Sequence, residues 1–138
     1  YLDDIRDPGN MGTIIRIADW YNIKYLIASP ESVDFYNPKV VQSAMGGHLR
    51  VSLISTDLPS ADLTDINLYA LVMNGKPINN NTTYPPGIIV VGNESHGISE
   101  KILKLDCQLM AIKKWGGAES LNASVACGIA CQMLVVPK

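Results

Sequence analysis

The chain has 138 residues, of which 47% are hydrophobic and only 17% are charged, and its formal net charge is −2 at pH 7. This length fits one domain whose core needs neither disulfides nor a metal for stability. The near-neutral charge excludes a small, uniformly basic protein that binds nucleic acid through bulk charge. Basic residues outnumber acidic ones only over residues 76–138, so we expect an anionic ligand to lie nearer that half.

The cysteines and histidines are sparse. Cys107, Cys127 and Cys131 form no clustered framework, which is typical of a reduced chain in the cytoplasm. His48 and His96 lie far apart in the sequence, so we expect no metal site. No apolar run reaches the length of a membrane-spanning helix, and we expect no membrane partner.

Apolar periodicity predicts that strands and helices alternate along the chain. We expect strands at residues 1–5, 25–28, 49–54, 68–73, 88–91 and 107–112. We expect helices at residues 11–21, from 38 to the glycines at 46–47, 99–105 and about 121–135. The stretch 56–67 reads as a loop or a vestigial helix, and 74–86 as a turn-rich linker. The chain opens as the end of a strand, so we expect a segment upstream of it.

The strand at 88–91 is an unbroken run of β-branched residues, which is typical of a strand buried on both faces. The pattern as a whole predicts an α/β fold with a mostly parallel sheet and helices on both faces. Ligands of such sheets bind at the carboxyl ends of the strands. Three loops at those ends, 7–16, 92–98 and 112–124, hold the unusual residues of the chain.

The first loop follows a strand and opens a helix, so its free backbone N–H groups could meet an anion. It matches neither the dinucleotide fingerprint nor the P-loop. Arg16 could contact a phosphate or a developing oxyanion, or it could be a solvated residue paired with Asp19 or Asp7. Spacing alone favours the second interpretation.

In the second loop, Gly92 and Gly97 bracket four polar residues. Glycine there permits positive φ and the close approach of a ligand. Glu94 is a candidate acid, base or hydrogen-bond acceptor. Ser95 does not fit a nucleophile elbow, because Asn93 stands where that motif needs glycine. We interpret His96 as a surface residue.

The third loop brings several polar residues to the start of the last helix. Ser120 could cap that helix, but Glu119, Ser120, Asn122 and Ser124 are more polar groups than one cap needs. Asn122 and Ser124 would lie within the first turn, where a buried Asn must find partners.

Taken together, the three loops resemble the motifs of the SpoU/TrmH-type RNA 2′-O-ribose methyltransferases of the SPOUT class. The similar segments are 7–16, 89–98, and Ile112 with 116–126, and residues 33–46 are also similar. The resemblance covers nearly the whole chain. It implies a C-terminal part tied in a trefoil knot, a homodimer, and methylation of a ribose 2′-hydroxyl in ribosomal or transfer RNA with S-adenosylmethionine.

The resemblance also implies roles for single residues. The cofactor would be bound in the knot by Val91, Gly92, Asn93, Glu94, Gly97, Ile112, Trp115, Leu121, Asn122 and Ser124. Catalysis would rest on Arg16, supported by Asn10, Glu94, Ser120 and Asn122. Because arginine stays charged, we interpret Arg16 as a phosphate anchor and oxyanion stabiliser. Ser120 and Asn122 would orient Arg16 and the methyl donor, and Glu94 would hold the knot loops through backbone N–H groups.

The chain departs from the family pattern in two ways. Lys113 and Lys114 follow Ile112, where the family has proline, and the family's separate N-terminal RNA-binding domain is missing. We therefore expect residues 1–138 to be the catalytic domain of a longer protein. An alternative is a knotted RNA-binding or assembly module without activity. A dinucleotide-dependent α/β enzyme is the weakest alternative, because the phosphate fingerprint is missing.

Overall fold

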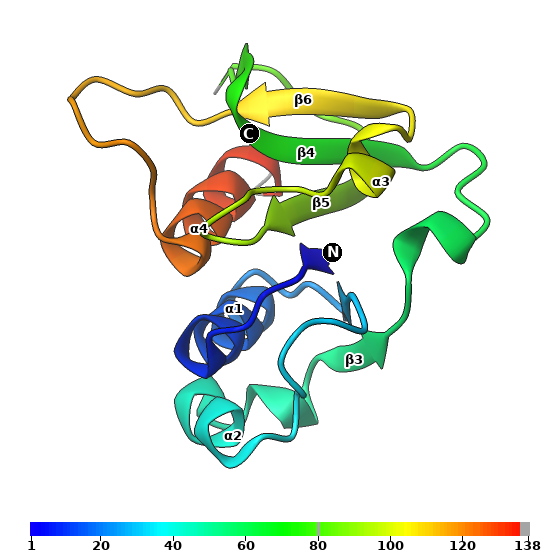
Figure 1. Ribbon diagram of the computed structural model, residues 1–138, viewed down its shortest axis with the longest axis vertical. Helices are drawn as coiled ribbons and strands as arrows, with labels where there is room; N and C mark the ends of the chain where they lie inside the picture. The colour runs from blue at the N-terminus through cyan, green and yellow to red at the C-terminus, as the bar shows by residue number, and fades with distance from the viewer. Residues whose placement is uncertain (80, 136–138) are drawn as a thin grey trace.

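The computed structural model describes residues 1–79 and 81–135 as one six-stranded sheet with helices packed on it (Figure 1). The strand order is β3-β2-β1-β5-β4-β6, and neighbouring strands run parallel. The mostly parallel sheet is thus confirmed. The strands are β1 (Leu2–Asp3), β2 (Tyr25–Ala28), β3 (Ser52–Ser55), β4 (Asn67–Pro77), β5 (Gly87–Gly92) and β6 (Cys107–Ala111).

The first two helices begin where their sequences place capping residues. Asp7 accepts a 2.7 Å hydrogen bond from the backbone N–H of Asn10, and Asn37 accepts one of 3.0 Å from that of Lys39. In each case proline follows the cap, where its missing N–H costs nothing. The helices are α1 (Pro8–Trp20), α2 (Pro38–Ala44), α3 (Glu100–Leu103) and α4 (Ala123–Leu134), with short 3₁₀ turns η1 (Gly47–Leu49) and η2 (Leu58–Ser60).

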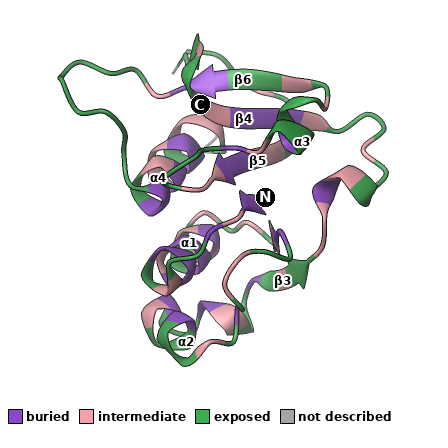
Figure 2. Cartoon of the chain, viewed as in Figure 1, coloured by how far each residue is buried: buried purple, intermediate pink, exposed green. Residues whose placement is uncertain are grey.

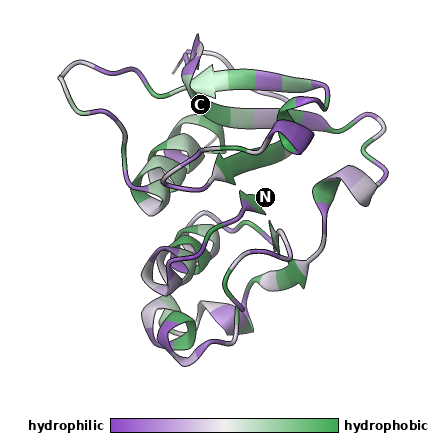
Figure 3. Ribbon diagram, viewed as in Figure 1, coloured by the Kyte–Doolittle hydropathy of each residue, from purple (hydrophilic) through white to green (hydrophobic). Residues whose placement is uncertain are grey.

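The sheet is covered on both faces. Successive residues of β5 show this, because Val91 packs in the core that α1, α2 and α4 form, whereas Val90 packs with Leu58 of η2 and Ile102 of α3. Figure 2 shows that the central strands are mostly buried or half-buried, and Figure 3 that β5 is strongly hydrophobic along its length. Within the described residues, no helix is both long and apolar enough to cross a membrane.

The predicted linker at 74–86 is wrong in its first part, since β4 continues to Pro77. The pairing of β4 with β6 shifts between Leu71 and Lys76, both of which pair with Met110. Gly75 makes this return possible, because a Cβ there would lie 2.6 Å from the carbonyl carbon of Met110. Residue 80 of the predicted linker lies outside the described residues.

Other predicted boundaries are also corrected. The strand predicted at 1–5 is only Leu2–Asp3, and the helix predicted at 11–21 is Pro8–Trp20 because Asp7 caps it. The strand predicted at 49–54 begins at Ser52, because residues 47–49 form the turn η1. The helix predicted from about residue 121 begins at Ala123, because Asn122 is its N-cap. The side chain of Asn122 accepts hydrogen bonds from the backbone N–H groups of Ser124 and Val125, at 2.9 and 3.3 Å. Such a bond satisfies backbone donors that the first turn of a helix leaves free.

Candidate active site

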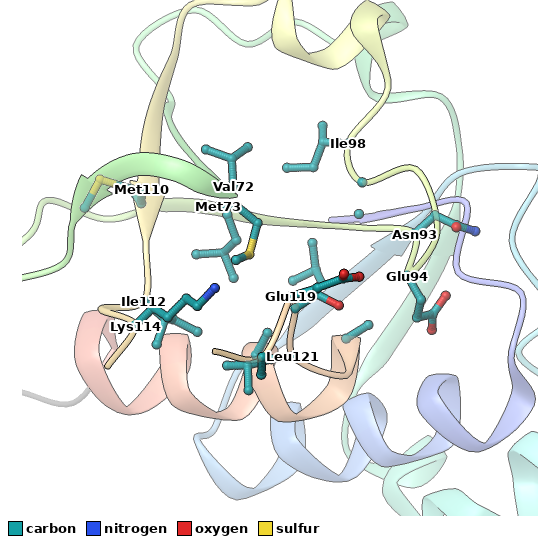
Figure 4. A pocket seen from close by; sticks show the side chains of 18 of the residues that line it. Val72, Met73, Asn93, Glu94, Ile98, Met110, Ile112, Lys114, Glu119 and Leu121 are labelled. Atoms are coloured by element: carbon teal, nitrogen blue, oxygen red, sulfur yellow. The ribbon is translucent and has the colours of Figure 1, made fainter. Parts of the chain in front are cut away.

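A cavity of about 770 Å³ lies at the carboxyl ends of β5 and β6, beside the shifted part of β4 and the start of α4. Figure 4 shows Asn93 and Glu94 at one end of it and Ile112 and Lys114 at the other. The volume is that of a typical small-molecule site. Its apolar walls come mainly from Leu71, Val72, Ile98, Met110, Ile112 and Leu121.

Most of the predicted site residues line this cavity, whereas Asn10, Arg16, Asn122 and Ser124 do not. Those that line it are Val91, Gly92, Asn93, Glu94, Gly97, Ile112, Trp115, Ser120 and Leu121. The two groups are joined through the start of α4, because Ala123, between Asn122 and Ser124, also lines the cavity.

A closed turn over residues 93–97 forms one end of the cavity. The backbone N–H and C=O groups of Asn93 and Gly97 exchange hydrogen bonds of 3.0 and 2.9 Å. Gly97 adopts φ +72°, a region that glycine enters without strain. Gly92 touches the closed end of the turn, since a Cβ there would lie 2.3 Å from the carbonyl carbon of Gly97. The two predicted glycine positions therefore hold this turn against β5.

The three predicted loops converge through one chain of side-chain hydrogen bonds. The amide nitrogen of Asn122 donates to Oδ1 of Asn10 at 2.9 Å. Asn10, only 9% exposed, donates through its own amide nitrogen to Glu94. The bonds thus join the start of α1, the turn after β5 and the cap of α4. Glu94, expected to accept backbone N–H groups, instead accepts a side-chain amide.

The start of α4 is held by Asn122. Besides the cap bonds, its Oδ1 accepts a 2.7 Å hydrogen bond from the hydroxyl of Ser124, which is buried. The side-chain oxygen of Asn122 thus accepts hydrogen bonds from the first turn of α4, while its nitrogen donates one to Asn10. Ser120, expected as a possible cap, is exposed and lies in the loop before the helix. The capping role falls to Asn122 because it directly precedes the first helical residue.

Arg16 lies on α1 with its side chain exposed, and its two expected acidic partners are engaged elsewhere. Asp19 pairs with Arg50 at 2.8 Å, and the hydrogen bond from that guanidinium holds the pKa of Asp19 below its ordinary value. Asp7 caps α1. Within the part of the chain that the structure describes, Arg16 makes no hydrogen bond or ion pair, so its guanidinium is available to an anion. The pairing favoured by spacing alone is therefore wrong.

Sequence reasoning missed the contribution of β4. Leu71, Val72 and Met73 line the cavity from the stretch where β4 loses its register with β6. The signal was available, because residues 68–73 were expected to form a strand and its carboxyl end belongs at the same edge as the others. The prediction considered only loops with conspicuous polar residues.

His96 lines the cavity too, and it is tied to the first strand. Its Nε2 lies 3.0 Å from a carboxylate oxygen of Asp4, while the side chain of Asn93 donates to the backbone carbonyl of Asp4 at 2.7 Å. These bonds fix the turn after β5 to the residues that follow β1. Across residues 1–79 and 81–135, the structure holds no group of three or more His, Cys, Asp or Glu residues that could bind a metal ion.

A covered parallel sheet, a ligand-sized cavity at its strand ends and three polar loops that meet there define an α/β domain that binds a small ligand. The sequence model of the SpoU rRNA Methylase family matches residues 1–132. The chain belongs to this family, and the resemblance drawn from the motifs is confirmed.

Particular relatives agree with this assignment. The chain is 30% identical over 133 residues to the 23S rRNA (guanosine(2553)-2′-O)-methyltransferase RlmP of Bacillus subtilis, covering 93% of this chain and 54% of that protein. A protein of Porphyromonas gingivalis assigned to the TrmH family of RNA methyltransferases superposes with a TM-score of 0.88 at 33% identity, covering 96% of this chain and 56% of that one.

A third relative was solved with a ligand. The SpoU methyltransferase AviRb of Streptomyces viridochromogenes, crystallised with the cofactor AdoMet, superposes with a TM-score of 0.81 at 28% identity, covering 93% of this chain and 55% of that one. The chain thus spans about half the length of the relatives it matches.

Proposed function

We propose that residues 1–138 form the catalytic domain of an enzyme that methylates a ribose 2′-hydroxyl in ribosomal or transfer RNA, with S-adenosylmethionine as methyl donor. The observation that carries the proposal is the convergence of Asn10, Glu94 and Asn122, from three separate motifs, beside one cavity. Named relatives methylate ribose 2′-oxygens of 23S rRNA.

The cavity suits S-adenosylmethionine. Its apolar walls, among them Val72, Ile98 and Leu121, offer surface for a purine, and its ends carry exposed polar groups and backbone for the rest of the molecule. Gly97 has no side chain, and a Cβ there would meet no atom within 4 Å, so the backbone at this end of the turn can come close to a ligand. When bound, the cofactor supplies an electrophilic methyl group on a positively charged sulfur.

The chain must then activate a weak nucleophile. A ribose hydroxyl attacks only as it loses its proton or as its developing negative charge is stabilised. Arg16 serves the second need, because a permanently charged guanidinium binds phosphate in a bidentate manner and stabilises an oxyanion. Asn10 stands six residues earlier on α1, so the Glu94–Asn10–Asn122 bonds fix the end of the helix that carries Arg16. Ser120 lines the cavity and can orient the methyl donor.

The knot and the homodimer are part of the same proposal. The segment after β6 leaves the edge of the sheet and sweeps back to α4, which packs against α1 and β5 (Figure 1). Such a return supports a knotted C-terminal part. Exposed apolar side chains at the beginning of α4, namely Leu121 just before the helix and Val125 in its first turn, support burial against a second copy. Sedimentation equilibrium tests the dimer.

A cytoplasmic location also belongs to the proposal. The three cysteines are free in the structure, and free thiols persist in reducing compartments. Fractionation of cells that express a tagged full-length protein tests this location.

The deciding experiment is transfer of labelled methyl groups from S-adenosylmethionine by the full-length protein. Ribosomal RNA and transfer RNA from cells that lack the gene serve as separate substrates, and nuclease digestion locates the label on the ribose. We expect label at a 2′-oxygen of one of the two RNA classes. Calorimetry that detects no cofactor binding at millimolar concentration would refute the proposal. RNA binding with no transfer would favour the inactive module.

A further inference from the structure

The loop from β6 to α4 carries a tryptophan that the fold does not use. Residues 113–122 are exposed throughout, as the green colour of this loop in Figure 2 shows. The indole of Trp115 exposes 85% of its surface and belongs to no core cluster. Gly116 and Gly117 follow it in open space, where a Cβ at either position would meet no atom within 4 Å. The loop therefore presents Trp115 to a ligand without burying it in the protein.

A cation lies on one face of this ring. The ammonium group of Lys113 sits 4.0 Å from the ring centroid, within the range of an attractive cation–π contact. Lys114 follows Lys113 directly in the sequence. An exposed indole beside two lysines combines a stacking surface with positive charge, which is the combination that proteins use to bind single-stranded nucleic acid.

The position of the ring favours RNA over the cofactor as its ligand. Trp115, Lys113 and Lys114 line the same cavity as the apolar walls, so the ring stands at its mouth. A small-molecule site buries most of its ligand, and the half-buried or buried walls Val72 and Ile98 can do so. An indole that is 85% exposed cannot enclose a purine, but it can stack on one face of a base outside the cavity.

We propose that Trp115 stacks on an unpaired base of the RNA substrate at the mouth of the cavity, while Lys113 contacts a neighbouring phosphate. This inference rests on the proposed function for the identity of its substrate. It deepens that function, because a stacked base must lie outside a helix, and single-stranded loops and bulges are where RNA bases can be splayed out. The substrate class is therefore an unpaired stretch of RNA.

Trp20 provides a matched control. It exposes 84% of its surface, nearly the same as Trp115, but it stands at the end of α1, does not line the cavity and has no cation over its ring among the described residues. Because both rings are exposed, we expect Trp115→Ala and Trp20→Ala to leave the fold intact, which circular dichroism can check.

The test measures the affinity of the full-length protein for a fluorescein-labelled single-stranded RNA by anisotropy, and for S-adenosylmethionine by calorimetry. We expect Trp115→Ala to weaken RNA binding by roughly five- to a hundred-fold, which is the range for loss of one stacked base. Trp115→Phe should restore most of the affinity. Trp20→Ala should leave it unchanged. Lys113→Ala should make the plot of the logarithm of the binding constant against the logarithm of salt concentration less steep, by the amount expected for the loss of about one phosphate contact.

Two results would overturn the inference. The first is unchanged RNA affinity in Trp115→Ala. The second is a loss of cofactor affinity as large as the loss of RNA affinity, which would assign the ring to the cofactor. A wild-type protein that binds RNA and transfers no methyl group would refute the proposed function instead. The RNA affinities of Trp115→Ala and Trp20→Ala could still be compared, because that measurement does not depend on methyl transfer.

Discussion

The amide nitrogen of Asn122 donates a 2.9 Å hydrogen bond to Oδ1 of Asn10, a residue 112 positions earlier in the chain. The amide nitrogen of Asn10 in turn donates a hydrogen bond to the carboxylate of Glu94, in the turn after β5. Because the cap of α4, the start of α1 and this turn border one site, the bond between the two asparagines couples the helix that carries Arg16 to the wall of the cavity. Substitutions at these three residues can therefore test what each hydrogen bond contributes to stability and to methyl transfer.

The acceptor in this chain of bonds is tested by Glu94→Gln and Glu94→Ala. Glutamine keeps an oxygen that accepts from Asn10, whereas alanine removes it. We expect Glu94→Ala to lower the free energy of unfolding by about 1 kcal/mol, the contribution of one side-chain hydrogen bond, and to slow methyl transfer more than tenfold. Glu94→Gln should stay close to the wild type in urea unfolding and keep most of the transfer rate. Equal losses in the two variants would mean that the carboxylate charge matters and the hydrogen bond does not.

Gly92 and Gly117 make a second matched pair. A Cβ at position 92 would lie 2.3 Å from backbone of the turn, whereas one at position 117 would touch nothing within 4 Å. We expect Gly92→Ala to push the turn off β5, to destabilise the protein by about 1–3 kcal/mol as overpacking does, and to weaken cofactor binding in calorimetry. Gly117→Ala should change stability by less than about 0.5 kcal/mol. Normal cofactor affinity in Gly92→Ala would separate the turn from the binding site.

Local patterns were sufficient to predict those elements that depend on neighbouring residues. The strand expected at 25–28 has the predicted bounds, and the helix expected from Pro38 begins there although it ends at Ala44 and not at the glycines, because alternation, the Asn37 cap and the proline act within a few residues. The path of β4 was not predictable in this way. Its return to β6 depends on Gly75 packing against the backbone of a strand more than thirty residues later, and no periodicity within 68–86 records that contact.

The candidate site likewise has parts that the local sequence predicts and parts that depend on contacts between distant segments. Glycines at strand ends identified the turn at 92–97 and the loop at 112–124, since a parallel sheet places such loops at one edge. The contact of Asn10 with Asn122 depends on α1 packing beside α4, which only the strand order determines. The residues of β4 that line the cavity were missed, because apolar residues in an apolar strand look like core.

The thiols should report on the integrity of α4. Cys127 and Cys131 are buried on that helix, and Cys107 is half-buried in β6. Burial raises the pKa of the Cys107 thiol, with the nearby Asp106 carboxylate adding to the effect, so its reactive thiolate is scarce at pH 7 and becomes more abundant as the pH rises. We expect slow reaction of Cys107 with a thiol reagent, faster above pH 9, and reaction of the other two only on unfolding. A Cys107→Ser variant that still reacts rapidly when folded would show that α4 opens.

The last prediction separates binding from chemistry at Arg16. Its side chain is exposed, and no described residue pairs with it, so truncation should cost the fold less than about 0.5 kcal/mol. We expect Arg16→Ala to bind S-adenosylmethionine like the wild type but to transfer methyl groups at least a hundred-fold more slowly, the scale of losing one stabiliser of a developing charge. The transfer rate of Arg16→Lys, which keeps the charge but not the bidentate geometry, should fall between those of the wild type and Arg16→Ala.

Arg50→Ala is the control for this prediction. It removes another exposed arginine, whose partner is Asp19, and should leave transfer unchanged. Transfer at the wild-type rate in Arg16→Ala would remove Arg16 from the mechanism. A parallel loss of cofactor affinity would instead make it a binding residue.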